Sequence, residues 1–584
     1  MDNREVARLL EEIATLLELK GENPFKSRAY QNAARAVDAL EEEVAVLVES
    51  GRLAGAAGIG PSIADKLTEL VRTGRLAAIE ELRREVPAGL REMISVPGLG
   101  PKRARALHDA LGIGSLADLE QACRDGRIEE LKGFGARTQE LILAGIALRR
   151  RVRDRRLLSE ADAAAAALTA AVARTPGIGR MSVAGSLRRR RETIKDIDIV
   201  VASSDAEAVM EAFTSYAEVE TIIARGPTRS SVRLTAGIQA DLRVVTEAEY
   251  PFALLYFTGS KAHNIGMRGR ALKMGLKLNE YGLFAGDTPV ECTSEEAIYE
   301  RLGLGYVPPE LREDLGELAA AERGTLPELV TQGDLAGIFH VHSTWSDGTD
   351  TIATLARAAR DRGYRYLGIS DRVRPTSDGD VETEPRLGPD ELAAQRAEIL
   401  ALQGEMDDFQ ILHGLEVDIL PDGRLDCPAS ILTELDFVIA AVHSAHDQDL
   451  ATMTARLERA VADPHTTILG HPTGRRIFAR DAAAIDLGRV LGACREHGVA
   501  IEVSGDPERL DLDWLGCRRA HDAGCTVVLN PDARSAEGLA NTVFALATAR
   551  RGWIEAREVM NARSWDGGSR LAITQRGRTG GRST

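Results

Sequence analysis

Cysteine and long apolar segments are both in short supply in this chain of 584 residues. The six cysteines are scattered and no two form a Cys-x-x-Cys pair, so we expect reduced structural thiols and neither a disulfide framework nor a zinc ribbon. No uninterrupted apolar run is long enough to span a bilayer, and the first residues, Met-Asp-Asn-Arg-Glu, lack an apolar signal region. We therefore expect a cytoplasmic protein without a membrane role.

The excess of acidic residues does not exclude a nucleic-acid partner. The formal net charge of −16 argues mildly against one. The positive charge is concentrated locally, however, in the runs Arg149–Arg156 and Arg188–Arg191. Such runs can form phosphate-binding surfaces on an acidic protein, or they can be solvated helix faces, and the runs themselves leave both readings open.

The apolar pattern divides the chain into a helical front, a mixed centre and an alternating second half. Residues 1–88 have helical periodicity, and residues 160–175 form a further Ala-rich helix. Strands are expected over 197–202 and 232–245. From 337 to 573, short apolar strands alternate with helices rich in Ala, Leu and Arg, which predicts a βα barrel.

One short stretch combines a small turn, arginines and two aspartates. Gly185-Ser186 forms the turn, Arg189 follows it, and Asp196 and Asp198 open an apolar strand. Residues i and i+2 of a strand point to the same face, so both carboxylates can hold hard divalent cations such as Mg²⁺. The turn and the arginine can bind phosphate oxygens. Metal ions beside a phosphate cradle are what in-line phosphoryl or nucleotidyl transfer requires.

A third carboxylate can complete this site. Asp241 lies in a predicted strand that is suited to pair beside residues 197–201. There it could deprotonate a sugar 3′-hydroxyl or help to bind the metal ion that activates it. Taken alone, Asp241 reads as an ordinary strand residue. The catalytic interpretation depends on its neighbours Asp196 and Asp198.

Three Gly-x-Gly turns each precede a predicted helix. Glycine lets backbone N–H groups approach a phosphate, and the helix N-terminus adds partial positive charge. One such turn is often only a structural cap, but three of them, two followed by Lys or Arg, predict helix-hairpin-helix contacts to a DNA backbone. The residues concerned are Gly58, Gly60, Gly98, Gly100, Lys102, Gly133 and Gly135.

The second half contains a set of potential metal ligands. Nine of the eleven histidines lie at or beyond His340. In βα barrels the carboxyl ends of the strands converge on the active site, and imidazole with carboxylate suits Zn²⁺, Mn²⁺ or iron. The residues at or just after predicted strand ends are His340, His342, Glu416, His443, His471 and Asp532.

With the added stretches Tyr-Phe-Thr-Gly-Ser at 256–260 and Asn-Glu-Tyr at 279–281, the first 320 residues resemble the family X DNA polymerases. The resemblance implies all-α N-terminal domains followed by an α+β nucleotidyltransferase palm. The expected divisions are a helical lyase-type domain at 1–88, helix-hairpin-helix fingers at 89–150, the palm at 151–258 and a nucleotide-selection domain at 259–320.

The resemblance also implies roles for the palm residues. Asp196, Asp198 and Asp241 would bind two Mg²⁺ or Mn²⁺ ions, with Asp241 nearest the primer 3′-hydroxyl. Ser186 and Arg189, beside Gly185, would hold the β and γ phosphates of the nucleotide.

The nucleotide-selection residues follow from the same resemblance. Tyr256, Phe257 and Gly259 would line the sugar pocket and disfavour a 2′-hydroxyl. Asn264 would contact the minor-groove edge of the incoming base, and Arg268 would contact the template strand.

An abasic-site lyase is a further implication. Lys66 falls where the family's Schiff-base lysine sits, and a lysine nucleophile can open an abasic sugar by β-elimination. A second family lysine is replaced by Ser62, while Lys26 and Arg35 could contact a 5′-phosphate. The alternative is that Lys66 is a solvent-facing helix lysine.

Residues 337–573 resemble the PHP (polymerase and histidinol phosphatase) domain, a distorted βα barrel whose metal cluster hydrolyses phosphodiesters, often as a 3′→5′ exonuclease. His-x-His followed by Ser-Asp-Gly, Gly-Leu-Glu-Val-Asp, Val-His-Ser and Gly-His-Pro carries the resemblance and adds Asp347 to the ligands. A linker at 321–336 would precede the domain, and a disordered tail at 574–584 would follow it.

Two ligand positions of the PHP pattern are altered. The family has histidine where this chain has Arg372 and Arg534. Because arginine stays protonated and does not ligate metals, we expect two ions, Zn²⁺ or Mn²⁺, where the family holds three. Nuclease activity is then expected to be weak, altered or lost.

The sequence thus predicts a template-directed DNA polymerase that fills short gaps during DNA repair. It would act as a monomer near the nucleoid, on gapped or nicked double-stranded DNA with dNTPs. The alternative is a metal-dependent phosphoesterase or 3′→5′ exonuclease as the main activity, and a non-enzymatic scaffold is a third reading.

Overall fold

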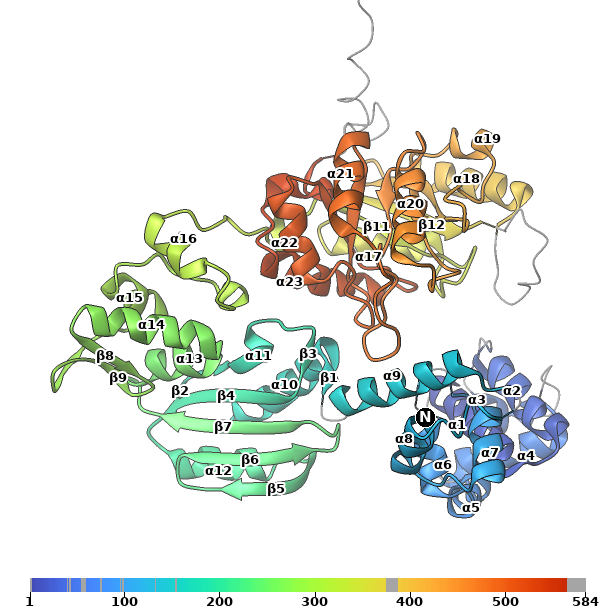
Figure 1. Ribbon diagram of the computed structural model, residues 1–584, viewed down its shortest axis with the longest axis horizontal. Helices are drawn as coiled ribbons and strands as arrows, with labels where there is room; N and C mark the ends of the chain where they lie inside the picture. Colours follow the sequence, from blue (N-terminus) through green and yellow to red (C-terminus); the bar gives the residue numbers. More distant parts are fainter. Residues whose placement is uncertain are drawn as a thin grey trace, which may run out of the picture. The chain divides into compact units, whose positions relative to one another are not determined.

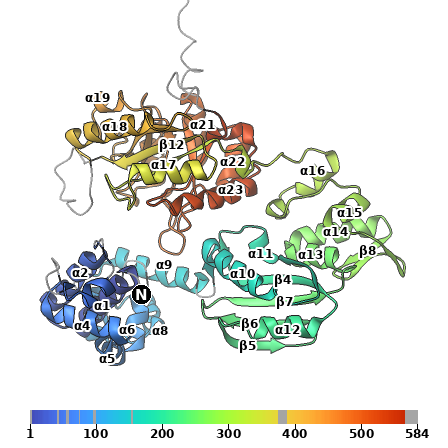
Figure 2. The ribbon, with the colours of Figure 1, turned by 180° about the vertical axis from the view of Figure 1, so that it is seen from behind.

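The computed structural model describes residues 3–564, apart from 39, 41, 43, 54–58, 74–75, 95, 97–98, 132, 153–154 and 374–386. The chain divides into two compact units, Met1–Arg153 and Asp154–Thr584. The predicted combination of all-α N-terminal domains, an α+β centre and a C-terminal parallel barrel is confirmed (Figures 1 and 2).

The first unit is built from α helices around an aliphatic core. Leu10, Ile13 and Leu17 of the first helix are almost completely buried and form the centre of that core. The helices are α1 (Asn3–Lys20), α2 (Pro24–Asp38), α3 (Val44–Glu49), α4 (Pro61–Thr73), α5 (Ala77–Glu85), α6 (Ala88–Met93), α7 (Pro101–Leu111), α8 (Leu116–Arg124) and α9 (Ala136–Val152). Helices α4, α7 and α9 begin directly after the three Gly-x-Gly turns.

The second unit opens with a five-stranded sheet in the order β2-β4-β7-β6-β5. Its strands are β2 (Ile178–Val183), β4 (Asp196–Ser203), β5 (Val219–Arg225), β6 (Arg229–Leu234) and β7 (Gln239–Val245). Strands β4 and β7 are parallel and the other pairs are antiparallel. The apolar side chains of α10 (Leu158–Val172) and α12 (Ala206–Thr214) form one core with the sheet.

The sheet differs from the sequence-based expectation at one place. The strand expected over 232–245 is in fact two antiparallel strands, β6 and β7. Gly237 adopts a φ of 73° between them, a left-handed conformation that favours glycine and turns the chain. A short pairing of β1 (Arg156–Leu157) with β3 (Thr193–Ile194) lies outside this sheet.

Helices α13 (Tyr250–Thr258) and α14 (Lys261–Lys273) lead from the sheet into a smaller helical region. This region contains the hairpin strands β8 (Leu276–Asn279), β9 (Gly282–Ala285) and β10 (Thr288–Val290), followed by α15 (Glu295–Arg301). Helix α16 (Glu317–Arg323) overlaps the start of the linker expected at 321–336. Ala320 and Ala321 of α16 pack into the core of this region, so the first part of that segment is ordered.

The last domain is a parallel barrel of seven strands in sequential order. The strands are β11 (Gly337–Val341), β12 (Tyr366–Arg372), β13 (Gln410–Asp418), β14 (Phe437–Ala441), β15 (Ile468–Leu469), β16 (Ala500–Ser504) and β17 (Val527–Asn530). A bridge between Val341 and Ala533 brings the two ends of the sheet together and nearly closes the barrel.

Helices cover the outside of the barrel, as Figure 1 shows. They are α17 (Ile352–Asp361), α18 (Pro389–Gln403), α19 (Ala429–Leu432), α20 (Leu450–Val461), α21 (Leu487–His497), α22 (Trp514–Asp522) and α23 (Thr542–Arg551). The strands are buried on both faces, which is why their sequences are continuous apolar runs rather than alternating ones. Across the described residues, no helix combines the length and apolar character needed to cross a membrane.

Candidate active sites

The palm aspartates lie side by side on neighbouring strands. Asp198 of β4 and Asp241 of β7 are direct partners in the parallel register, and Asp196 precedes Asp198 by two residues on the same face. Burial, followed by repulsion from Asp196 and Asp241, raises the pKa of Asp198 to about 7. Crowding of carboxylates in a partly buried place is relieved by a bound cation, so these residues fit Mg²⁺ or Mn²⁺.

Neighbouring side chains already fix the position of Asp241. Its carboxylate accepts hydrogen bonds from the hydroxyl of Ser231 and from the side-chain amide Nε2 of Gln239, the latter at 2.8 Å. Among the described residues, the three palm aspartates are not one of the groups whose potential ligand atoms all lie within 4.8 Å of one another. The register therefore brings the three together, while the tightest clusters lie in the barrel.

The Gly-Ser turn approaches the carboxylates closely. Gly185 has a φ of 62°, and a Cβ at this position would lie 2.1 Å from Oδ2 of Asp198. The backbone N–H of Ala184 donates to the carbonyl of Asp198 at 2.7 Å. Ser186 follows in the short helix α11 (Gly185–Arg188). Only glycine provides both the backbone conformation and the space at this point.

Arg189 lies in a buried network behind the turn. Its side chain is about one-tenth exposed, its Nε contacts Glu313 at 3.1 Å, and its Nη1 donates to the carbonyl of Thr258 at 2.5 Å. The preceding arginine, Arg188, contacts the buried Glu295 at 2.6 Å. Arg189 is thus held at the end of α13, where the nucleotide-selection region begins.

Three of the predicted nucleotide-selection residues line one pocket. Tyr256, Asn264 and Arg268 face it together with Leu255 and Asn279. Nδ2 of Asn264 donates to the carbonyl of Tyr256 at 2.7 Å, which links helices α13 and α14.

The other two predicted residues adjoin this pocket. The rings of Phe257 and Tyr256 meet edge to face at 5.2 Å, and the guanidinium of Arg243 lies 5.2 Å from the centre of the Phe257 ring. Gly259 ends α13 with a φ of 70°.

In the first unit, Lys66 lines a cavity of about 410 Å³ together with Lys20, Lys26, Tyr30 and Ser62. The Nζ of Lys66 donates to the Ser62 hydroxyl at 3.2 Å. Lys26 is exposed and forms an ion pair with Glu22 at 3.7 Å. Ser62, which replaces the family's second lysine, is therefore a hydrogen-bond partner of Lys66.

The predicted DNA-contacting turns are only partly described. Gly58 and Gly98 lie outside the described residues. A Cβ at Gly60, Gly100, Gly133 or Gly135 would meet nothing within 4 Å. The space next to these four glycines is therefore unoccupied. Lys102 is exposed on α7, one residue after Pro101.

The barrel brings six of its predicted ligands together. Three overlapping groups have ligand atoms that all lie within 4.8 Å of one another: His340, His471 and Asp532; His340, His342 and Glu416; and Glu416, His443 and His471. Nε2 of His340 and both ring nitrogens of His342 are buried and make no hydrogen bond of good geometry among the described residues, although each lies 3.2–3.9 Å from a carboxylate oxygen of the cluster. Orphaned imidazole nitrogens beside carboxylates are what a bound divalent metal would satisfy, so these residues fit metal binding.

Further carboxylates orient the histidines from behind. Nδ1 of His340 contacts Glu502 at 2.6 Å, and Nδ1 of His443 contacts Asp418 at 2.5 Å. Such contacts fix the ring and the tautomer, leaving Nε2 directed at the cluster. Sequence reasoning missed both carboxylates. Glu502 had a visible signal, because it is an acid in an otherwise apolar strand, Val499–Val503.

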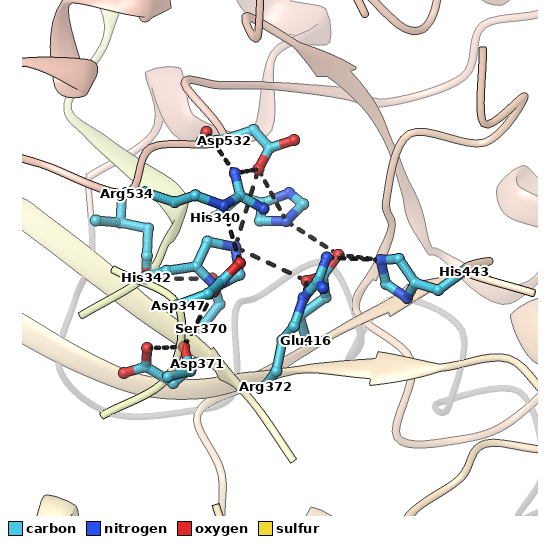
Figure 3. A network of polar contacts seen from close by, with 12 residues as sticks. His340, His342, Asp347, Ser370, Asp371, Arg372, Glu416, His443, Asp532 and Arg534 are labelled. Carbon is cyan, nitrogen blue, oxygen red and sulfur yellow. Dashed lines mark hydrogen bonds and ion pairs between the residues drawn. The ribbon is translucent and has the colours of Figure 1, made fainter. Parts of the chain in front are cut away.

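The two arginines lie among the ligands, as Figure 3 shows. Nε of Arg372 contacts Glu416 at 2.8 Å, and its Nη2 lies 3.1 Å from Nε2 of His443. Arg534 contacts Asp347 at 2.9 Å and Asp532 at 3.0 Å. Asp347, predicted as a ligand, is outside the three tight groups and is paired with Arg534.

Charge in this cluster is balanced between carboxylates and cations. Although burial opposes it, Arg372, His443 and His340 hold the pKa of Glu416 well below its usual value. Burial lowers the pKa of His342 to about 3, and burial with Arg509 lowers that of His471 to about 4. Both rings are therefore neutral near pH 7, which is the form that binds metals.

Comparisons with known proteins agree with this architecture. Residues 1–76 match a helix-hairpin-helix domain, residues 90–148 a tandem helix-hairpin-helix domain, and residues 253–313 the thumb of DNA polymerase beta. The chain is 36% identical to the DNA polymerase/3′-5′ exonuclease PolX of Bacillus subtilis over 97% of its own length and 98% of that protein. The chain belongs to the bacterial PolX proteins of polymerase family X.

Other relatives match parts of this PolX-family chain. A probable phosphatase of Caldanaerobacter subterraneus is 32% identical over 21% of the chain and 46% of that protein, and one of Thermoanaerobacter sp. is 29% identical over 32% and 70%. Human DNA-directed DNA/RNA polymerase mu is 44% identical over 13% of the chain and 16% of that protein. The PolX family thus joins a polymerase-like part to a phosphatase-like barrel.

Proposed function

We propose that the chain is a template-directed DNA polymerase that fills short gaps during DNA repair. The observation that carries the proposal is the parallel pairing of Asp198 with Asp241 directly behind the Gly185 turn. Similarity to the Bacillus subtilis protein along almost the whole chain supports it. Its partners would be gapped or nicked duplex DNA and dNTPs, and we propose a cytoplasmic monomer.

The palm residues would divide the work of nucleotidyl transfer. Mg²⁺ or Mn²⁺ held by Asp196, Asp198 and Asp241 would neutralise the phosphates and favour ionisation of the primer 3′-hydroxyl. Asp241 would lie nearest that hydroxyl, oriented by its hydrogen bonds to Ser231 and Gln239. The Gly185-Ser186 turn would offer backbone N–H groups and a hydroxyl, and Arg189 its guanidinium, to the β and γ phosphates.

Nucleotide selection would take place at the pocket between α13 and α14. Tyr256, Phe257 and Gly259 would face the sugar and disfavour a 2′-hydroxyl by contact. Asn264 and Arg268 line the same pocket and would contact the base edge and the template strand. The turns at Gly58, Gly60, Gly98, Gly100, Lys102, Gly133 and Gly135 would contact the DNA backbone without reading bases.

The experiment is single-nucleotide extension of a gapped primer. Asp198→Ala is expected to abolish incorporation, while Asp287→Ala, an exposed aspartate in the turn between β9 and β10, should retain it. Equal incorporation by the wild type and Asp198→Ala would overturn the polymerase assignment.

For the barrel we propose a two-ion site with weakened or altered 3′→5′ nuclease activity. His340, His342, Glu416, His443, His471 and Asp532 would hold Zn²⁺ or Mn²⁺, while Arg372 and Arg534 supply positive charge in place of a third ion. Bound ions would activate water for phosphodiester hydrolysis. Three ions per barrel, measured by elemental analysis of the Asp198→Ala variant to remove the palm site, would contradict this arrangement.

A phosphoesterase as the main activity is the second candidate, favoured by the three ligand groups of the barrel. Nuclease assays on gapped substrates decide between the two. If His340→Ala removes the principal activity while Asp198→Ala leaves it intact, the barrel is the main catalytic domain.

A lyase function for Lys66 is proposed from its place in the cavity with Lys20 and Lys26. Borohydride should trap wild-type protein on an abasic-site DNA through the Schiff base. Lys277→Ala, a variant of the exposed lysine on β8, serves as the control. If Lys66→Ala is trapped as well as the wild type, Lys66 is not the nucleophile.

A further inference from the structure

The last helix of the barrel reaches the palm through one buried arginine. Arg551, at the end of α23, is 1% exposed. Its Nη1 donates to the backbone carbonyl of Arg189, its Nη2 contacts Glu313 at 3.1 Å, and its guanidinium lies 4.7 Å from the ring centre of Trp514. A barrel residue thus holds both the backbone of Arg189 and the carboxylate that binds the Arg189 side chain.

Glu313 is shared between the palm and the barrel. Its Oε1 contacts Nε of Arg189 and Nη2 of Arg551, both at 3.1 Å, and its Oε2 lies 3.5 Å from Arg191. Although burial opposes it, Arg551 and then Arg189 lower the pKa of Glu313. Because several cations divide one carboxylate, no single arginine is bound to it as strongly as in an isolated pair.

A second barrel residue holds the other end of the same palm segment. Arg475 contacts both carboxylate oxygens of Glu192, at 2.6 and 3.2 Å, and its side chain is 14% exposed. Between the two contacts Arg190 has a φ of 56°, a left-handed conformation that is costly for arginine and needs support from its surroundings. The segment 189–192 is thus fixed by the barrel at both ends.

Apolar contacts show that this junction is packed. Phe544 of α23 packs against the core of the palm sheet, and Trp553, just after α23, is 7% exposed within the core of the α14–α16 region. The barrel is therefore part of the structure that supports the nucleotide-binding turn.

We propose that Arg551 is a positioning residue for nucleotide binding by the palm. It holds the Arg189 backbone in place and offsets the charge of Glu313, so that the Arg189 guanidinium can exchange Glu313 for the triphosphate. The proposal rests on the proposed polymerase function, in which Arg189 contacts the β and γ phosphates. It assigns the barrel a role in polymerisation that is independent of hydrolysis.

Removal of Arg551 would act on the nucleotide rather than on DNA. Without it, one of the three arginines that offset the charge of Glu313 is lost, so that Arg189 pairs with Glu313 more strongly, and the carbonyl of Arg189 loses its donor. The triphosphate must then compete with a stronger ion pair, which raises the KM for dNTP. Since the carboxylates at the reacting centre are untouched, kcat at saturating dNTP should change little.

The test measures KM and kcat for dNTP on gapped DNA with the full-length protein. Arg551→Met is expected to raise KM about tenfold, which corresponds to about 1.4 kcal/mol. Arg550→Met is the matched control, because the adjacent arginine contacts Glu310 and the carbonyl of Val330 instead of the palm segment. Adding Glu313→Gln to Arg551→Met should return KM toward the wild-type value.

Binding assays separate positioning from general damage. Arg551→Met should weaken inhibition by inorganic tripolyphosphate in parallel with KM, and leave the Kd for gapped DNA unchanged. A KM equal to that of wild type, an equal rise in Arg550→Met, or failure of Glu313→Gln to restore KM would each overturn the proposal.

Two further results, a variant that does not fold and a failure of the polymerase assignment, can be told apart. If Arg551→Met does not fold, Arg475→Met tests the other end of the segment, and an unchanged KM in that variant overturns the proposal. If Asp198→Ala incorporates nucleotide as well as wild type, the polymerase function itself fails. If the protein is an active polymerase whose KM for dNTP is the same in wild type and Arg551→Met, only the positioning role of Arg551 is refuted.

Discussion

Replacement of Arg372 by methionine is expected to destabilise the metal-free barrel strongly. Glu416 is 2% exposed, and Arg372 contacts its carboxylate at 2.8 Å. The other contacts come from His340, His443 and His471 at 3.1–3.3 Å and from His342 at 3.8 Å, and these rings carry charge only when protonated. Loss of one partner from a buried ion pair costs about 3–5 kcal/mol, because the remaining charge is left without compensation.

The effect is large enough for calorimetry of the full-length protein in a chelator. At about 2–4 °C per kcal/mol for a domain of this size, the barrel transition should fall by roughly 6–20 °C. Zn²⁺ or Mn²⁺ should restore the variant more than it stabilises the wild type, because a divalent ion supplies the missing positive charge next to Glu416. The control, Arg396→Met, breaks an exposed pair with Glu434 and should cost less than about 1 kcal/mol.

The unfolding temperatures of the two variants decide whether Arg372 balances the charge of Glu416. If Arg372→Met and Arg396→Met unfold at the same temperature in the chelator, the histidines alone satisfy Glu416. Arg372 would then not be replacing an ion. A fall in temperature that added metal does not reverse would show that the variant has lost packing rather than charge balance.

Three further predictions concern the palm, the barrel and the thumb. Gly185→Ala should lower kcat/KM on gapped DNA on the order of 100-fold, because its Cβ would lie 2.1 Å from Oδ2 of Asp198. Gly286→Ala, at the same φ of 62° but with nothing within 4 Å, should keep its activity. Burial, then Arg396, lowers the pKa of His413 to about 4 from an ordinary 6.5. As the pH falls, the His413 imidazole is therefore protonated at a higher pH in the unfolded chain than in the folded one. Stability should therefore fall by up to about 3 kcal/mol between pH 6.5 and 4, and His413→Gln should flatten this pH dependence in thermal unfolding. Arg312→Met removes one of the two arginines that pair with the buried Glu295, Arg188 being the other, and should speed hydrogen exchange across α13–α15 by a local loss of about 1.5–3 kcal/mol.

Much of the barrel could be predicted from the sequence. Each strand is a mostly apolar run, and in a parallel barrel these runs end at the same rim. His340 was therefore expected to approach His471 from another strand, and the two share a ligand group; His342 and His443 each join a group that contains Glu416. The carboxylates that orient the histidines could not be paired with them from the sequence, because neither Glu502 nor Asp418, the last residue of the Gly-Leu-Glu-Val-Asp motif, has a spacing that identifies its histidine partner.

The sequence could predict on which strand face the palm aspartates lie, but not which residues are paired across neighbouring strands. The spacing of Asp196 and Asp198 assigns both to one face of β4, since side chains alternate along a strand. The partner of Asp198 could be assigned to Asp241 only when the register of β4 and β7 was known, because a shift by one residue would turn Asp241 to the opposite face.

The sequence by itself determined which chemistry the chain carries, since short motifs contain their turn, their ligands and their strand periodicity within a few residues. The tertiary structure alone decided which charges meet. Arg551 and Arg189 are 362 residues apart, and Arg475 and Glu192 are 283 apart. Ion pairs of this kind have no periodicity or spacing along the chain, because they form only when separate domains are packed against each other.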